Sequence, residues 1–241
     1  MIYKILPLVA TLLMSFSSNL SNKEVINPEA PKMLASNSAS AFEAKAASVY
    51  HNLHSETISA MPQLESFTTA LKGFYALKES GKITKDILTI VDFSLSSNVK
   101  RLWVIDLTTN TVLFNSLVAH GRNTGEEFAT NFSNSAESYK SSLGFYATGE
   151  IYGGKHGRSL KLDGLERGIN DGARARGVVM HGADYVSESF IKNNHRLGRS
   201  QGCPAVPVEL TDEIIDLIKD KSCLFIYHPS GSYKSHSKLI S

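Results

Sequence analysis

Residues 101–114 read Arg-Leu-Trp-Val-Ile-Asp-Leu-Thr-Thr-Asn-Thr-Val-Leu-Phe, and this stretch decides the class of the fold. Its first and last parts are rich in β-branched and aromatic residues, which favour strands. The polar residues Thr108-Thr109-Asn110 between them are typical of a tight turn. The stretch therefore predicts two antiparallel strands joined by a hairpin.

Similar strand-like stretches lie on both sides of this hairpin. They are Ile87–Phe93, Leu143–Thr148, Ser159–Leu162, Gly177–His181 and Cys223–Tyr227. Few helical stretches separate them, which disfavours a parallel sheet with crossover helices. We expect a mainly β fold, antiparallel or mixed, arranged as a β-sandwich with flanking helices.

Three other stretches have helical periodicity. Apolar residues recur at three- and four-residue steps from Phe42 to Leu53, from Leu64 to Tyr75 and from Leu210 to Ile218. Gly81 is expected to end the second of these helices. All three apolar faces are expected to pack against a core.

The first residues favour export. Met1-Ile2-Tyr3-Lys4 gives a positively charged start, an apolar run follows to Met14, and Ser15-Phe16-Ser17 fits a small-residue cleavage site. A membrane-spanning helix needs ~20 apolar residues, so the run favours a cleaved signal peptide over a retained anchor. We expect a periplasmic or extracellular location, with no stable membrane span after cleavage.

Composition divides the 241 residues into five parts. We expect a signal peptide over 1–17, a linker over 18–40, a helical N-terminal region over 41–85, the main domain over 86–230 and a C-terminal tail over 231–241. The net charge of +2 offers no case for a nucleic-acid partner. The sequence has no H-E-x-x-H and no C-x-x-C, so we expect no metal and no cofactor.

The most informative stretch is Arg199-Ser200-Gln201-Gly202-Cys203-Pro204. A glycine before the cysteine permits a sharp turn that gathers successive N–H groups, which can lower the pKa of a thiol and bind an oxyanion. His181 ends the strand-like run Val178-Val179-Met180, and a strand end holds a general base rigidly. The intervening chain is long enough to bring imidazole beside sulfur. The pair therefore predicts a cysteine nucleophile activated by a histidine.

Two alternatives use the same residues. An exported protein permits a disulfide between Cys203 and Cys223, and from the residues alone this alternative and the nucleophile are nearly even. The run Gly198-Arg199-Ser200-Gln201-Gly202 also matches the G-x-S-x-G motif of serine hydrolases. That motif needs a strand directly before it and a helix directly after it, whereas loop residues precede this run and Pro204 follows it.

Short motifs between Leu117 and Tyr227 occur in the same order as in a known family. They are Val118–Gly121, Phe132–Asn134, Ser141–Gly144, Gly154–Gly157, Ser159–Leu165, Val179–Val186 and Leu197–Ala205. On these motifs the chain resembles the murein L,D-transpeptidase catalytic domain family, a branch of the YkuD-like L,D-transpeptidases. The resemblance covers nearly half of the sequence and implies a YkuD-like β-sandwich catalytic domain over 86–230, preceded by the helical region.

The resemblance also implies a mechanism and a partner. In this family a cysteine thiolate attacks the amide before the terminal D-Ala of a peptidoglycan tetrapeptide stem. D-Ala leaves, and an amine of a neighbouring stem resolves the thioester into a crosslink. By position, the resemblance implies Cys203 as nucleophile, His181 as base and the Gly182 carbonyl as the group that orients the base.

Further roles follow from the same resemblance. The backbone N–H groups of Cys203 and Gly202 are expected to bind the oxyanion, and Ser200 is expected to shape their loop. Arg199 and Gln201 are the expected substrate contacts, although a surface ion pair is an equal alternative for Arg199.

The sequence departs from the family pattern in two places and leaves two rival functions open. Many members have a histidine where Gln201 stands, and Arg or Asn where Ala205 stands. One rival is an L,D-carboxypeptidase or endopeptidase that uses the same acyl-enzyme with water as acceptor. The other is a non-catalytic, disulfide-stapled binding protein of the cell envelope.

Overall fold

A computed structural model describes residues 30–56, 60–155 and 157–241 of the chain. Two compact units contain these residues, one ending at Ser38 and the other running from Ala39 to Ser241. The signal peptide predicted over 1–17 lies outside the described residues. Helix α1 spans Ala30–His51, so the linker predicted over 18–40 is helical from Ala30 onward.

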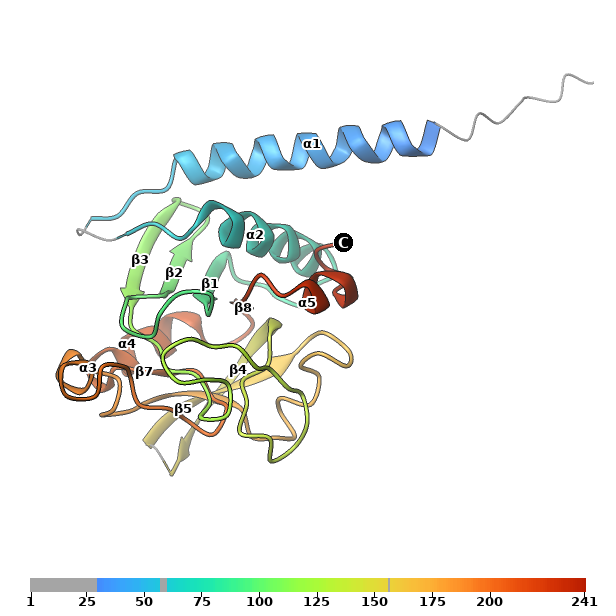
Figure 1. Cartoon of the computed structure of the whole chain (residues 1–241). Coiled ribbons are helices and arrows are strands. Elements are labelled where there is room, and N and C mark those ends of the chain that lie inside the picture. The colour runs from blue at the N-terminus through green and yellow to red at the C-terminus, as the bar shows by residue number, and fades with distance from the viewer. Residues whose placement is uncertain (1–29, 57–59, 156) are drawn as a thin grey trace, which may run out of the picture. The chain divides into compact units, whose positions relative to one another are not determined.

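Eight strands form one sheet in the described part of the second unit (Figure 1). Strands β1 and β8 pair in parallel, as do β6 and β7, and the other neighbours are antiparallel. The prediction of a mainly β fold with mixed pairing and flanking helices is therefore confirmed. In the order β3-β2-β1-β8-β4-β5-β6-β7, the strands are Thr111–Ser116, Leu102–Asp106, Ile87–Asp92, Cys223–Tyr227, Gly144–Gly154, Gly157–Gly164, Val179–Gly182 and Ala205–Val206.

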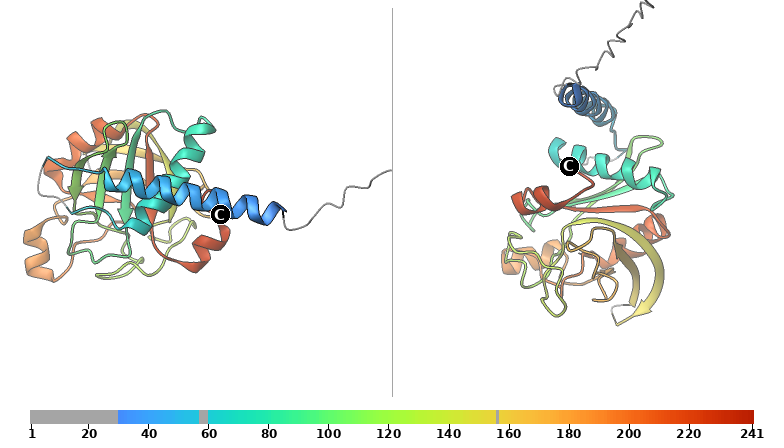
Figure 2. Two further views of the ribbon diagram at one scale, coloured as in Figure 1. Left: turned by 90° about the horizontal axis from the view of Figure 1, so that it is seen from above. Right: turned by 90° about the vertical axis from the view of Figure 1, so that its right-hand side faces the viewer.

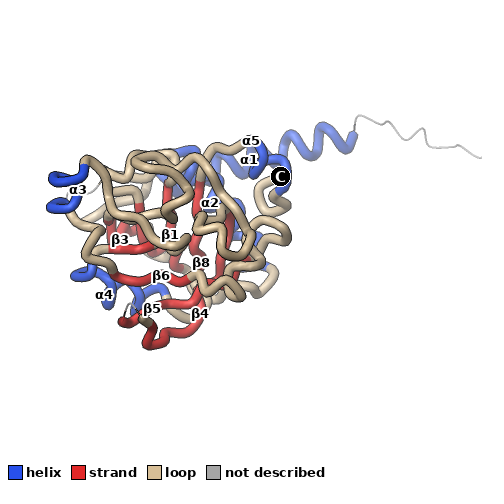
Figure 3. Tube along the Cα trace, turned by 60° about the horizontal axis from the view of Figure 1, so that its bottom comes forward, coloured by secondary structure: helices blue, strands red, loops and turns tan. Residues whose placement is uncertain are grey.

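The long strand β4 joins the two halves of this sheet. Residues 144–147 pair with β8 and residues 146–154 pair with β5, with a register shift between Thr148 and Ile151. The β4–β5 ribbon curves strongly (Figure 2), and β5 and β6 lie across the front of the sheet in Figure 3. The expected layers of a sandwich are thus parts of one continuous, curved sheet.

Helix α2 (Leu64–Glu79) packs on the sheet against β1 and β8. Any side chain at Gly73 would overlap the ring of Phe145, which in turn stacks on Phe225 with 4.1 Å between ring centroids. Gly81, at φ +67°, ends the helix as predicted. The predicted helical region over 41–85 therefore shares a core with the sheet.

Helix α4 (Val208–Ile218) confirms the third predicted helix and lies against β5 and β6. Two short helices were not predicted. Helix α3 (Glu188–Asn194) has no buried residue, so it has no apolar stripe to reveal it. Helix α5 (Gly231–His236) and the residues after it form no loose tail, because the hydroxyls of Tyr233 and Ser237 both donate to buried Glu166.

Candidate active site

Strand β6 holds His181 in the interior of the sheet. His181 pairs with Ser159 of β5 on one side and with Ala205 of β7 on the other, and it is 2% exposed. Its Nδ1 lies 2.9 Å from the carbonyl oxygen of Gly182. A carbonyl oxygen can only accept a hydrogen bond, so Nδ1 carries the proton and Nε2 of the neutral ring is unprotonated. This is the tautomer that a general base requires.

Helix α4 fixes the carbonyl that orients His181. A Cβ at Gly182 would overlap the Thr211 hydroxyl and would stand 3.3 Å from Cα of Val208. The helix therefore packs directly on the Gly182 backbone, and only glycine permits this approach.

Cys203 lies beside the same strand, two residues before β7. Its Sγ accepts a hydrogen bond from the Val179 N–H at 3.5 Å, and it lies 3.9 Å from the Gly177 carbonyl oxygen. Val179 and His181 are two residues apart on β6, so their Cα atoms are roughly 6.6 Å apart. The thiol thus contacts strand β6 two residues before His181.

The environment of Cys203 has opposing effects on its thiol. Burial raises the pKa of Cys203, whereas the Val179 N–H and the positive charge of Arg176 lower it. Tyr185 also lies near the thiol: burial, followed by the charge of Cys203, raises the pKa of Tyr185 to about 12. Its phenol is therefore protonated at neutral pH. Tyr185 packs on Gly198, where any side chain would overlap it.

Ser200 shapes the loop that carries Cys203. Its hydroxyl donates to the Cys203 carbonyl oxygen at 2.6 Å and accepts from the Gly202 N–H at 3.0 Å. Gly202 has φ +119°, and a Cβ there would stand 2.8 Å from the Lys140 carbonyl oxygen. The Gly202 N–H, expected to bind the oxyanion, is thus engaged inside its own loop. The Cys203 N–H stays a prediction for that role.

The segment 119–122 is hydrogen-bonded to the loop that carries Cys203. Ala119 exchanges backbone hydrogen bonds with Ala205, and the Ser200 N–H donates to the His120 carbonyl at 3.0 Å. The His120 ring is buried, with Nδ1 at 2.8 Å from an Arg101 nitrogen. Burial and then the charge of Arg101 lower the pKa of His120 to about 4, so the ring is neutral at pH 7 and supports the loop from inside the core.

The two expected substrate contacts lie apart from the thiol's partners. Arg199 donates to a Glu126 carboxylate oxygen at 2.5 Å and to two backbone carbonyls, which is the arrangement that the ion-pair alternative describes. Gln201 is exposed at the loop surface. The arginine whose charge acts on Cys203 is Arg176, which the sequence reasoning missed. Its position directly before the strand that ends in His181 was the available signal.

Both cysteines are free thiols in the structure. Cys223 lies fully buried in β8, between Leu88 of β1 and Ala147 of β4, and burial raises its pKa well above the ordinary range. The disulfide alternative, and with it a disulfide-stapled binding protein, does not hold in this structure.

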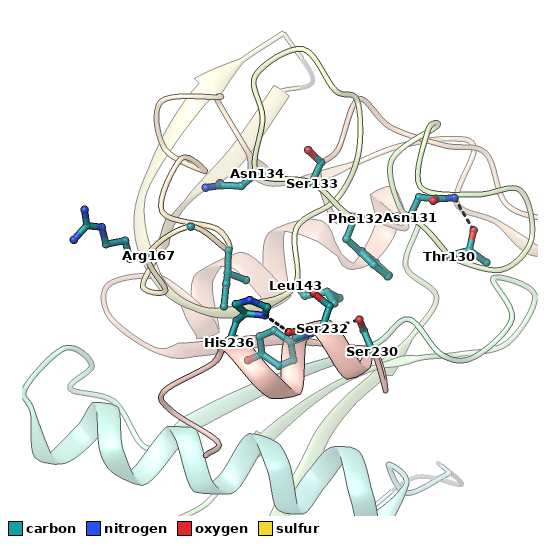
Figure 4. Close-up of a pocket in the computed structure, with 13 residues that line it drawn as sticks. Thr130, Asn131, Phe132, Ser133, Asn134, Leu143, Arg167, Ser230, Ser232 and His236 are labelled. Atoms are coloured by element: carbon teal, nitrogen blue, oxygen red, sulfur yellow. Dashed lines mark hydrogen bonds between the residues drawn. The ribbon is translucent and has the colours of Figure 1, made fainter.

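The described residues form a pocket of about 480 Å³ (Figure 4). Residues 130–134 and the start of α5 form much of its wall, and none of the predicted site residues lines it. Ser133 connects the two regions, because its carbonyl oxygen accepts a hydrogen bond from Arg176 at 2.9 Å.

Two kinds of feature are absent from the described residues. No helix among them is long and apolar enough to cross a membrane. Within the same residues, no cluster of three or more His, Cys, Asp or Glu side chains is placed to hold a metal ion.

The sequence match assigns the family. The model of the L,D-transpeptidase catalytic domain matches residues 59–227, which is more than half of the chain. The chain therefore belongs to the L,D-transpeptidase catalytic domain family, as the ordered motifs predicted. The matched range includes helix α2 and every strand of the sheet.

Several solved structures are similar, and a search of curated proteins finds no match. An L,D-transpeptidase from Mycobacterium smegmatis has 10% identity and a TM-score of 0.37 over 59% of each chain. An Enterococcus faecium L,D-transpeptidase mutant has 12% identity and a TM-score of 0.37 over 59% of this chain and 50% of its own. One from Xylanimonas cellulosilytica has 12% identity and a TM-score of 0.35 over 78% and 93%. This chain thus spans less than two thirds of the first two relatives, and the family assignment rests on the sequence match.

Proposed function

We propose that this protein is an exported peptidoglycan L,D-transpeptidase, with Cys203 as nucleophile and His181 as base. The observation that carries the proposal is the shared strand: β6 holds the His181 ring by the Gly182 carbonyl and contacts Cys203 Sγ through the Val179 N–H. Membership of the L,D-transpeptidase catalytic domain family supplies the reaction class.

The first half-reaction forms a thioester. His181 Nε2 takes the proton of the Cys203 thiol, and the thiolate attacks the carbonyl carbon before the terminal D-Ala of a tetrapeptide stem. The negative charge that develops on the carbonyl oxygen is stabilised by the Cys203 N–H. The C–N bond then breaks, the proton on His181 passes to the departing D-Ala amine, and the acyl group stays on sulfur.

The second half-reaction transfers that acyl group. An amine of a neighbouring stem attacks the thioester carbonyl while His181 accepts its proton. The C–S bond breaks, and the Cys203 thiolate leaves and recovers the proton from His181. The product is a crosslink between two peptidoglycan stems, which are the proposed partners of the protein.

Product analysis tests this reaction. Purified protein is incubated with tetrapeptide muropeptides, and the products are separated by mass. Crosslinked dimers support transfer, whereas tripeptides alone support the rival in which water accepts the acyl group. The Cys203→Ala variant is expected to give neither product, and unchanged turnover by that variant would contradict the proposal.

Export is a separate part of the proposal. The positively charged start, the apolar run and the small residues that end it support a leader removed after residue 17. The mass of the protein recovered from outside the cytoplasm tests this. A mass that retains Met1–Ser17 would contradict it.

A further inference from the structure

Arg176 lies three residues before the start of strand β6 and is hydrogen-bonded to one loop. Its two terminal nitrogens make four hydrogen bonds, all to the segment 133–142. The partners are the Ser133 carbonyl at 2.9 Å, the Ser142 hydroxyl at 2.6 Å, the Ser138 hydroxyl at 3.3 Å and the Lys140 carbonyl at 2.7 Å. The guanidinium is therefore held in one orientation, with its charge fixed in space.

The same loop encloses the residue before Cys203. The Lys140 carbonyl oxygen would be 2.8 Å from a Cβ at Gly202, and an Arg176 nitrogen would be 3.4 Å from it. The Ser141 hydroxyl donates to the Gly202 carbonyl at 3.2 Å. Arg176 thus lies beside Gly202, and it holds the 133–142 loop, which packs on the Gly202 backbone.

Titratable side chains lie on several segments around the thiol. On the turn after β6, Tyr185 lies near the thiol and is protonated at neutral pH. On the 133–142 loop, Tyr139 stacks under the guanidinium of Arg122 at 3.9 Å, and Lys140 contributes its carbonyl. Arg199 on the Cys203 loop is paired with Glu126. The fixed positive charge that acts on the thiol is that of Arg176.

We propose that Arg176 is a positioning residue of this site, whose fixed charge favours the thiolate of Cys203 and couples thiolate formation to the packing of the 133–142 loop. The inference rests on the proposed role of Cys203 as nucleophile. A fixed positive charge stabilises a thiolate in a partly buried place, in addition to the hydrogen bond that the Val179 N–H donates to Sγ.

The pH profile of Cys203 alkylation tests the inference. The full chain is treated with iodoacetamide from pH 5 to 10, and the modified cysteine is identified by peptide mass; buried Cys223 serves as the internal unreactive thiol. In Arg176→Gln, the midpoint of the profile is expected to move to higher pH. The rate at pH 7 then falls about tenfold for each pH unit of that movement.

Two variants separate charge from structure. Arg176→Lys keeps the charge but loses the hydrogen-bonded fork, so its midpoint is expected to stay near that of the wild type. Arg174→Gln removes an equal charge two residues away, where the side chain pairs with Glu150 and Asp163, and it is expected to leave the midpoint unchanged. Arg176→Met is a second neutral variant in case the glutamine variant does not fold.

The inference is overturned if folded neutral variants titrate like the wild type, or if the lysine and neutral variants shift equally, as a purely structural role predicts. Failure of the proposed function gives a different result. In that case the wild type forms no acyl-enzyme with tetrapeptide stems, while the alkylation midpoints of the Arg176 variants still separate.

Discussion

Gly202→Ala is the substitution for which the structure gives the sharpest expectation. Gly202 has φ +119°, outside the small left-handed region that other residues can enter. An alanine Cβ would stand 2.8 Å from the Lys140 carbonyl oxygen, which Arg176 holds in place. Relief of that contact requires either the Cys203 loop or the 133–142 loop to shift.

The expected cost follows from these two facts. A residue forced into a sparsely populated backbone region costs roughly 1–3 kcal/mol. For a domain of this size, each kcal/mol lowers Tm by about 2–4 °C, so Tm is expected to fall by roughly 2–12 °C. Because one of these loops carries the nucleophile and the other packs on it, the rate of acylation is expected to fall far more than the lower stability explains.

Gly168→Ala is the matched control. Gly168 also has a positive φ, +76°, but a Cβ there would meet nothing within 4 Å. Differential scanning fluorimetry measures Tm for both variants, and intact mass spectrometry follows the rate of acyl-enzyme formation with a tetrapeptide stem. The reasoning is refuted if the Gly202 variant matches the Gly168 variant in both Tm and acylation rate.

Three further predictions concern the base, the buried histidine and the core. His181→Gln keeps the strand but removes the base, so acylation at pH 7 is expected to fall by roughly 10²–10⁴-fold, measured by single-turnover mass spectrometry. The His120 pKa of about 4 in the folded protein lies below that of histidine in the unfolded chain, so the free energy of unfolding is expected to fall by up to about 3 kcal/mol as the pH falls from 6.5 to 4. A urea-denaturation series that shows no change over this pH range would contradict this expectation. His120→Gln is expected to reduce the dependence of the unfolding free energy on pH. Phe145→Ala empties the contact with Gly73 and Phe225, and urea denaturation is expected to show a loss of roughly 3–5 kcal/mol.

The strands and the long helices were predictable because apolar residues recur at helical steps in the helices and form short continuous runs in the strands. Ile87–Asp92 and Cys223–Tyr227 are almost entirely buried, and runs of this kind favour strands whatever their partners are. The single curved sheet was not predictable, because pairing such as β1 with β8 joins segments more than a hundred residues apart, and no local pattern specifies it. Helix α3 has no buried residue and strand β7 has only two residues, so neither leaves a periodic pattern in the sequence.

The parts of the candidate site that could be predicted are those marked by residues close together in the sequence. The histidine at the end of a strand and the Gly-Cys turn are local features, and the order of motifs connected them to a family. Arg176 was missed because its role arises from contacts with residues 133–142, which are distant in the sequence. Arg199 was predicted as a substrate contact because it is close to Cys203 in the sequence, whereas in the structure its guanidinium forms an ion pair with Glu126.

Cys203, activated by His181 of strand β6, is proposed to form the acyl-enzyme. Imipenem has a strained β-lactam amide that a nucleophilic thiolate opens to leave an acyl group on sulfur, so it serves as a covalent probe of Cys203. The measurement is the intact mass of wild type, Cys203→Ala and Cys223→Ala after incubation with imipenem. Adducts on the wild type and on the Cys223 variant, with none on the Cys203 variant, are the expected result. Equal adduct formation by the two cysteine variants would contradict the account.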